Sequence, residues 1–404
     1  MGLLHELVTA DPARPRRAAL LLAAFAAVLT LALQWATVAC NHGGDWSALF
    51  VHGADYPAAP QLEWEGHRPI AATGFDGQIY HLIAHDPFLL DGLDRYVDAP
   101  RLRYRRILVP LAAHVLALGR ARWIDTAYRA VILLFVFAGT WWSARCAIAL
   151  GRAPLWGLAF LLVPAVAISA ERMTVDVGLA ALTAGFALYA ARPGSWRLMA
   201  VLALAALVRE TGVLLALGVA LATALAGQWR RALRPLLALL PALAWFAYVH
   251  ARTPSYEYPV DPRPLSGAVR AMISPDPAPD VAPGQVGEWW RQTILRKPAF
   301  DRVALLGVLL ALALGLWGLR PWPPGEAATA AGLFALLGVV SQRADQWLFV
   351  HDYGRVYSPL LVLLLLRGLR ERRVVLVLPL VLMWPRMLLE MTMQVVGILR
   401  AALH

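Results

Sequence analysis

The sequence predicts an all-α polytopic membrane protein with about 11 transmembrane helices. Of its 404 residues, 59% are hydrophobic and only 16% are charged, whereas soluble domains are about half apolar and a quarter charged. The apolar residues form long runs that leave no room for a water-facing domain of any size. The net charge of +11 comes from short arginine clusters between these runs. Such clusters are typical of cytoplasmic loops and argue against a nucleic acid as the partner.

The first apolar run, residues 18–40, follows three arginines and imitates a signal peptide. It is too long for the apolar core of a signal peptide and long enough to span roughly 30 Å of hydrocarbon. We therefore expect this run to remain as the first transmembrane helix, with its N-terminus in the cytoplasm.

Arginine clusters set the orientation of the other spans. If the clusters near residues 145–152, 192–197, 230–234, 320 and 367–373 are all cytoplasmic, the spans between them pair off as short helical hairpins. The predicted spans are residues 18–40, 124–144, 154–170, 174–191, 197–209, 210–227, 235–250, 301–319, 326–342, 355–369 and 374–397.

Two long loops then lie outside the cytoplasm, residues 41–123 and the Pro-rich residues 251–300. The apolar stretch 107–118 in the first loop is too short to cross a bilayer, so we expect an interfacial helix there. In the second loop, Trp289 and Trp290 are natural anchors at a membrane surface. The chain is thus divided into a module of residues 1–250, the loop 251–300 and C-terminal transmembrane helices in 301–404.

Ionisable residues outside the arginine clusters fall on the outer side of this topology. Four segments supply them. The first loop holds Asp45, Asp76, His81, His85, Asp86 and the RLRYRR run, and three turns hold Glu171, Arg172 and Asp176; Arg209 and Glu210; and Asp345, His351, Asp352 and Arg355. Charges at or within an apolar zone are costly and usually line a polar cavity or pair with one another. We therefore expect one cleft that opens outward. Alternatively, Arg209 and Glu210 form a structural ion pair that holds a helical hairpin closed.

The segment GFDGQIYHLIAHDP, residues 74–87, carries the sharpest local signal. Tyr80, Ile83 and Ala84 fall at helical spacing, which predicts a short amphipathic helix with Asp76 near its N-terminus. The helix dipole favours an ionised carboxylate there, as a general base requires. The alternative is that Asp76 is only an N-cap. Three other acidic residues of the loop are interpreted as ordinary solvated charges: Asp86, Asp91 and Asp98.

His81 and His85 are four residues apart on the same predicted helix and would share one face of it. Two imidazoles at this spacing can bind a divalent metal, but a full ligand set is missing, so no cofactor or metal is assigned. The chain also lacks the glycine-rich nucleotide-binding motifs. An activated donor would therefore have to arrive in the membrane.

The order of these features resembles integral-membrane glycosyltransferases of the C-type fold. FDGQIYHLIA is similar to the D-E-x-x-Y-x-x-A stretch of that family, RILVPLAAHVLALG to its P-P-L-x-x-x-L stretch, and short hairpins with a charged RETG turn follow. The resemblance covers roughly residues 18–250 and is closest to the bacterial branch that builds cell-surface glycopolymers. One departure is Gly77, because many family members have an acidic residue there.

This resemblance implies an inverting transfer from a polyprenyl-phosphate sugar to a lipid-linked or cell-envelope glycan acceptor, within membrane lipid. Asp76 would be the catalytic base, and Arg209, Arg355 and then Arg172 would hold the phosphate. Further substrate-binding residues would be Glu210, Asp176, Asp352, Tyr80 and His351. The expected location is a bacterial inner membrane, with the active site on the extracytoplasmic face.

Two other classes of function are alternatives. A transporter or flippase of lipid-linked envelope precursors would have repeats and charges near mid-span in both halves. A non-catalytic assembly factor for envelope polymers would not need the Asp76 helix and the arginine turns to converge.

Overall fold

The computed structural model describes residues 14–403 except 58, 62–66, 72, 193, 255–262, 276–294, 321 and 341–344. The structure is 77% helix, and the described residues contain no strand; Gly53 and Ala71 form an isolated bridge. The all-α prediction is therefore confirmed. Trp289 and Trp290, the expected surface anchors, lie outside the described residues.

Three of the described helices are long and apolar enough to cross a membrane: α2 (Arg14–Asn41), α7 (Ile124–Ala149) and α17 (Lys297–Trp317). Two further candidates are bent pairs. The 3-10 helix η4 (Pro154–Leu162) and α8 (Pro164–Arg172) meet at 60°. The short helices α12 (Trp229–Ala232) and α13 (Arg234–Leu237) meet α14 (Leu240–Arg252) at 49°. The described chain thus has three candidate spans, or up to five if each bent pair is one span.

The other predicted spans coincide with helices, most of them shorter. Four of these have 13 to 15 residues, which gives about 20 Å of helix against a hydrocarbon thickness of about 30 Å. The count of about 11 spans therefore stays a prediction. The helices in these other predicted spans are α9 (Asp176–Tyr189), α10 (Trp196–Val208), η5 (Glu210–Gly212), α11 (Val213–Leu225), α18 (Glu326–Val340), α19 (Val350–Glu371), η7 (Val374–Leu376), α20 (Leu378–Glu390) and α21 (Thr392–Leu403).

The first loop folds into short helices packed against the bundle: η1 (Trp46–Phe50), α4 (Asp76–His85), η2 (Leu93–Tyr96), α5 (Pro100–Arg103), α6 (Leu108–Leu116) and η3 (Ala121–Trp123). The expected interfacial helix is α6, which packs on α4 and α7. It leaves Val115 and Leu116 exposed, as a helix resting on a membrane surface would. The described part of residues 251–300 contains α15 (Ser266–Ile273), and η6 (Asp345–Trp347) precedes α19.

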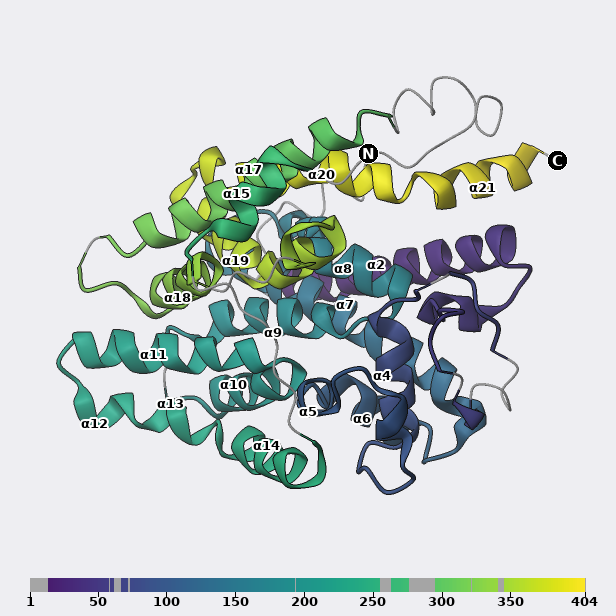
Figure 1. Ribbon diagram of the computed structural model, residues 1–404. Coiled ribbons are helices and arrows are strands. Elements are labelled where there is room, and N and C mark those ends of the chain that lie inside the picture. Colours follow the sequence, from purple (N-terminus) through teal and green to yellow (C-terminus); the bar gives the residue numbers. More distant parts are fainter. Residues whose placement is uncertain are drawn as a thin grey trace.

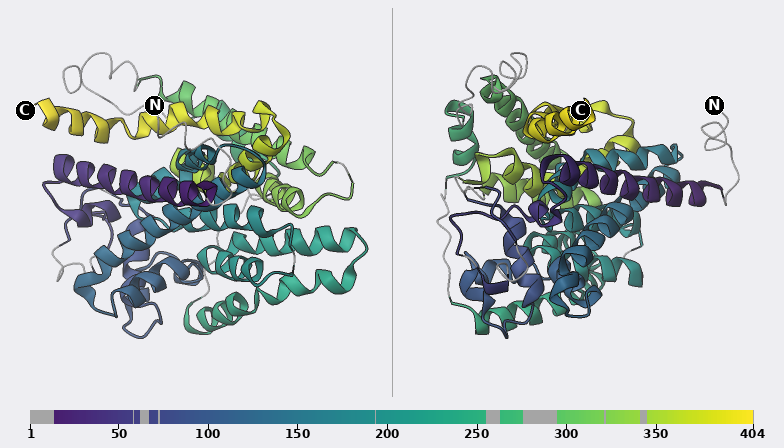
Figure 2. Two further views of the ribbon diagram at one scale, coloured as in Figure 1. Left: turned by 180° about the vertical axis from the view of Figure 1, so that it is seen from behind. Right: turned by 90° about the vertical axis from the view of Figure 1, so that its right-hand side faces the viewer.

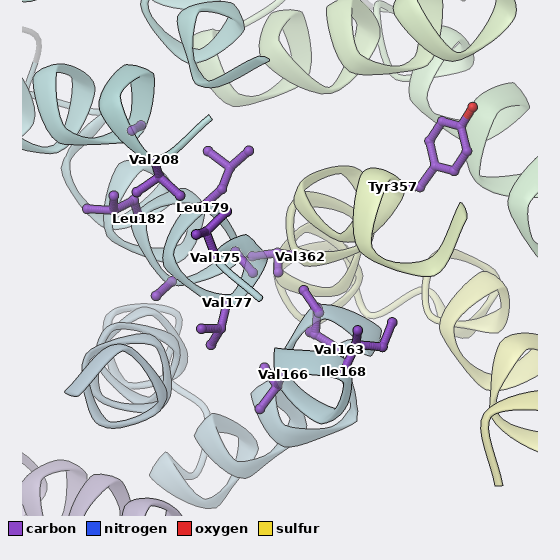
Figure 3. Close-up of a cluster of buried hydrophobic side chains, with 14 of the residues drawn as sticks. Val163, Val166, Ile168, Val175, Val177, Leu179, Leu182, Val208, Tyr357 and Val362 are labelled. Atoms are coloured by element: carbon purple, nitrogen blue, oxygen red, sulfur yellow. The ribbon is translucent and has the colours of Figure 1, made fainter. Parts of the chain in front are cut away.

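In the core, helices from the N-terminal part of the chain pack against helices from its C-terminal part. Helix α7 packs against α2 and α9, and α9 packs against α10 and α19. Figure 3 shows Val163 just before α8, Ile168 on α8, Val175 and Val177 at the start of α9, and Val362 of α19 in one apolar cluster. Figures 1 and 2 show α21, the C-terminal helix, running alongside α2.

Candidate functional site

Helix α4 places Asp76 at its first position, as the sequence predicts. Phe75 is extended, and its N–H donates to the carbonyl oxygen of Val51 at 2.9 Å. The helix starts in close contact with α8, because a Cβ on Gly77 would collide with the carbonyl oxygen of Arg172 and lie 2.9 Å from that of Phe50. Glycine is therefore required after Asp76. In Figure 1, α4 lies between α8 and α6.

Two arginines from distant segments hold the Asp76 carboxylate. The Arg103 Nη1 atom lies 2.9 Å from Asp76 Oδ2, and Arg355 Nη1 donates to the same oxygen. Burial by itself would raise the pKa of Asp76, but the guanidinium groups of Arg103 and Arg355 outweigh burial and hold this pKa well below its usual range. Asp76 is therefore ionised at neutral pH.

Arg355 links Asp76 to a second carboxylate on α9. Its Nη2 donates to Asp352 Oδ1 at 2.7 Å, and its Nη1 lies 3.9 Å from Asp176 Oδ2. Asp176 in turn accepts a hydrogen bond from Arg209. The structure thus brings together four of the predicted site residues with Asp76, from the starts of α4, α9 and α19 and the end of α10.

Glu210 and Tyr80 meet at another arginine, Arg106. Its Nε and Nη2 donate to the two oxygens of Glu210 at 2.9 and 2.7 Å, and its Nη1 donates to the Tyr80 hydroxyl at 3.0 Å. The interpretation of Arg209 and Glu210 as a pair that closes the hairpin is wrong, because Arg209 binds Asp176 and Glu210 binds Arg106.

Arg172 and His351 belong to a neighbouring network around Glu390. The Glu390 Oε1 atom lies 3.6 Å from Arg172 Nη2 and 3.5 Å from His351 Nδ1. The two networks meet at the Phe75 ring, whose centroid is 4.8 Å from the guanidinium carbon of Arg172 and 5.1 Å from that of Arg355. The buried Nε atoms of Arg172 and Arg355 have no hydrogen-bond acceptor among the described residues. Both arginines can therefore still donate to an anion.

Sequence reasoning missed Arg103, Arg106 and Glu390. The first two are three residues apart in the RLRYRR run of the first loop. The signal that could have identified them is this unusual number of arginines in a loop predicted to lie outside the cytoplasm. Asp98 was interpreted as a solvated charge, but it accepts two hydrogen bonds from Arg103, at 2.9 and 2.8 Å.

The interpretation of Asp86 as a solvated charge is wrong. Its side chain is buried and accepts hydrogen bonds from the backbone N–H groups of Leu90 at 2.7 Å and Asp91 at 3.0 Å. Asp86 therefore stabilises the turn after α4, because a buried carboxylate needs such donors.

An apolar cavity of about 730 Å³ lies beside the Arg172 end of α8. It is lined by residues of α2, η4, α8 and the C-terminal helices, including Leu33, Trp156 and Trp384. Leu33 and Trp156 are also exposed, so the cavity is open along one side. Its lining also includes Glu171 and Gln394, which are hydrogen-bonded to each other.

The predicted His81–His85 pair does form, with the two Nε2 atoms 3.3 Å apart. His81 also lies against His52 and His67, with ring centroids 5.7 and 4.8 Å away. Burial, together with the neighbouring imidazoles of His81 and His67, lowers the pKa of His52 to about 2, so the His52 ring is neutral at pH 7.

The chain matches no protein-family model, and comparisons with curated proteins and with solved structures find no match. The assignment of the site residues therefore rests only on their geometry in the structure.

Proposed function

We propose that this protein is an inverting integral-membrane glycosyltransferase of the C-type fold. It moves a sugar from a polyprenyl-phosphate donor to a lipid-linked or cell-envelope glycan acceptor. The proposal includes about 11 spans in a bacterial inner membrane, a cytoplasmic N-terminus and an extracytoplasmic active site. The observation that carries it is an ionised Asp76 held between Arg103 and Arg355. An open apolar cavity supports it, because its lining includes Glu171, the residue before Arg172.

The cavity suits the polyprenyl chain, since its lining is largely apolar and includes Glu171, the residue before Arg172. A guanidinium matches the geometry of phosphate oxygens and stays charged when partly buried. Arg172 is the best placed for this, because its carboxylate neighbours Glu390 and Glu171 are 3.6 and 3.8 Å away. This revises the order expected from the sequence, since Arg209 and Arg355 are already hydrogen-bonded to carboxylates.

In the proposed reaction, Asp76 accepts the proton of an acceptor hydroxyl while the hydroxyl oxygen attacks the anomeric carbon of the donor. The bond from that carbon to the phosphate oxygen breaks, and polyprenyl phosphate leaves with the electron pair. A carboxylate whose pKa is held so low is a weak base. Donor phosphate would draw Arg355 away from Asp76, and the loss of that cation would make Asp76 more basic.

The test is transfer by the purified Asp76→Asn variant in lipid vesicles, with a polyprenyl-phosphate sugar as donor. Asparagine cannot take the proton, and loss of a general base typically slows a reaction on the order of a hundredfold to ten-thousandfold. Donor binding should persist. The control is Asp91→Asn, because Asp91 is an exposed carboxylate in the same loop.

Transfer by Asp76→Asn at near wild-type rate would remove the base assignment. Movement of the donor between leaflets by the wild type, with no transfer to any acceptor, would instead favour a flippase.

A further inference from the structure

Three histidines from separate segments of the first loop come together at α4. His52 follows η1, His67 lies in the connection to α4, and His81 is on α4 itself. Their nearest ring nitrogens all lie within 4.8 Å of one another. Backbone pairing holds the first two segments together, because the N–H of Ile70 donates to the carbonyl oxygen of His52 at 3.0 Å.

Within this cluster, the burial of the polar His52 ring is the hardest to explain. It is 4% exposed, and neither Nδ1 nor Nε2 has a hydrogen-bond partner among the described residues. Buried polar atoms nearly always have a partner, and one without requires an explanation such as a bound ion. A phenylalanine would fill the same space without this cost, so packing alone does not account for a histidine.

A carboxylate stands beside the three rings. Asp125, in the first turn of α7, has Oδ1 2.7 Å from His81 Nε2 and Oδ2 3.4 Å from His67 Nε2. Histidines that bind metals usually bond a carboxylate in this way, which fixes the ring orientation and raises ligand basicity. Asp125 and His67 also line a polar cavity of about 780 Å³, which gives an ion a path to the cluster.

We propose that His52, His67 and His81 bind a divalent zinc-like cation, with Asp125 orienting two of the rings and balancing the charge. Neutral imidazoles suit zinc, which binds three or four such ligands. Nitrogens around tetrahedral zinc lie about 3.4 Å apart when each bond is about 2.1 Å. Binding therefore draws the three rings inward from their present separation.

The bound ion fastens the segments of His52 and His67 to α4 and α7. Asp76 lies five positions before His81 on α4, so the ion acts on Asp76 as a positioning device and has no contact with substrate. Zinc binding at this site does not require that Asp76 take part in sugar transfer. The site also differs from the His81–His85 spacing considered in the sequence, because its other ligands come from outside the helix.

The test measures metal content in the purified full-length protein. The wild type and variants are exposed to zinc chloride in detergent, desalted and analysed by elemental mass spectrometry. We expect about one zinc per chain in the wild type and less than about a tenth in His52→Phe, which keeps the ring shape but cannot bind a metal. His250→Gln, which alters an exposed histidine on α14, is the control and should retain the zinc.

Cobalt(II) provides a second measurement in case His52→Phe does not fold. The wild type should show the strong visible absorption of a four-coordinate cobalt site, and His67→Gln should lose it. Zinc should also raise the unfolding temperature of the wild type but not of either cluster variant. A wild type that holds less than about a tenth of an equivalent, or a His52→Phe protein that keeps its zinc, would overturn the proposal.

Discussion

Replacing Gly77 with alanine tests whether the contact between α4 and α8 sets the position of Asp76. The new Cβ would collide with the carbonyl oxygen of Arg172 and lie 2.9 Å from that of Phe50. Neither backbone oxygen can rotate away, so α4 must move by about 1 Å to restore an ordinary van der Waals separation. A misplacement of that size can cost about a hundredfold in rate.

The stability effect should be much smaller. Overpacking typically costs about 1–3 kcal/mol, but alanine regains about 1 kcal/mol over glycine within a helix. We therefore expect the Gly77→Ala variant to lose no more than about 2 kcal/mol in the free energy of unfolding. Thermal unfolding in detergent measures this change, and sugar transfer in vesicles measures the rate.

The matched control is Gly325→Ala, because a Cβ at Gly325 would meet no heavy atom within 4 Å. It should change stability by less than about 0.5 kcal/mol and leave transfer intact. A Gly77→Ala protein that is as stable and as active as the wild type would contradict this role of the contact. A loss of stability with full activity would show that the contact is tight but does not set the position of Asp76.

Three further perturbations follow from the ion pairs and the topology. Arg106→Leu should lower the free energy of unfolding by about 1–3 kcal/mol, because it leaves the half-buried Glu210 carboxylate without its bidentate partner, and adding Glu210→Leu should recover most of the loss; a double variant no more stable than Arg106→Leu would contradict this. Since the folded pKa of Asp76 is lowered, its ionic contribution to stability is full above about pH 4 and is lost in stronger acid. The difference in unfolding free energy between the wild type and Asp76→Asn should therefore be flat from about pH 5 to 8, and a change in that window would count against the pairing. In a background without the two free cysteines, an impermeant thiol reagent outside the cell should label Ser274→Cys but not Ala226→Cys, both at exposed positions; the reverse pattern would invert the topology.

Local sequence was enough to predict the helices and the start of α4. Apolar runs bounded by arginines can satisfy their backbone groups within a membrane only as helices, and each predicted span coincides with helix in the structure. Asp76 was placed at a helix start because the apolar positions after it recur at helical spacing, and α4 begins there. The lengths of the spans were less predictable, since bends such as that between η4 and α8 depend on packing partners.

The partners of the charged residues could not be predicted in this way. Arg209 and Glu210 are adjacent in the sequence and were candidates for a pair, yet Glu210 binds Arg106, 104 residues away, and Arg209 binds Asp176. Asp86 was predicted to be solvated because it lies in a loop. In the structure, backbone N–H groups of the turn that follows donate hydrogen bonds to its buried carboxylate.

Composition and periodicity were sufficient to predict which segments are helical, because they act over one or two turns of a helix. The packing of the helices places Asp76 between Arg103 and Arg355 and brings His52 next to His81. An ion pair or a metal site depends on distances of a few ångströms between segments that are far apart in the chain. Those distances arise only when the helices pack.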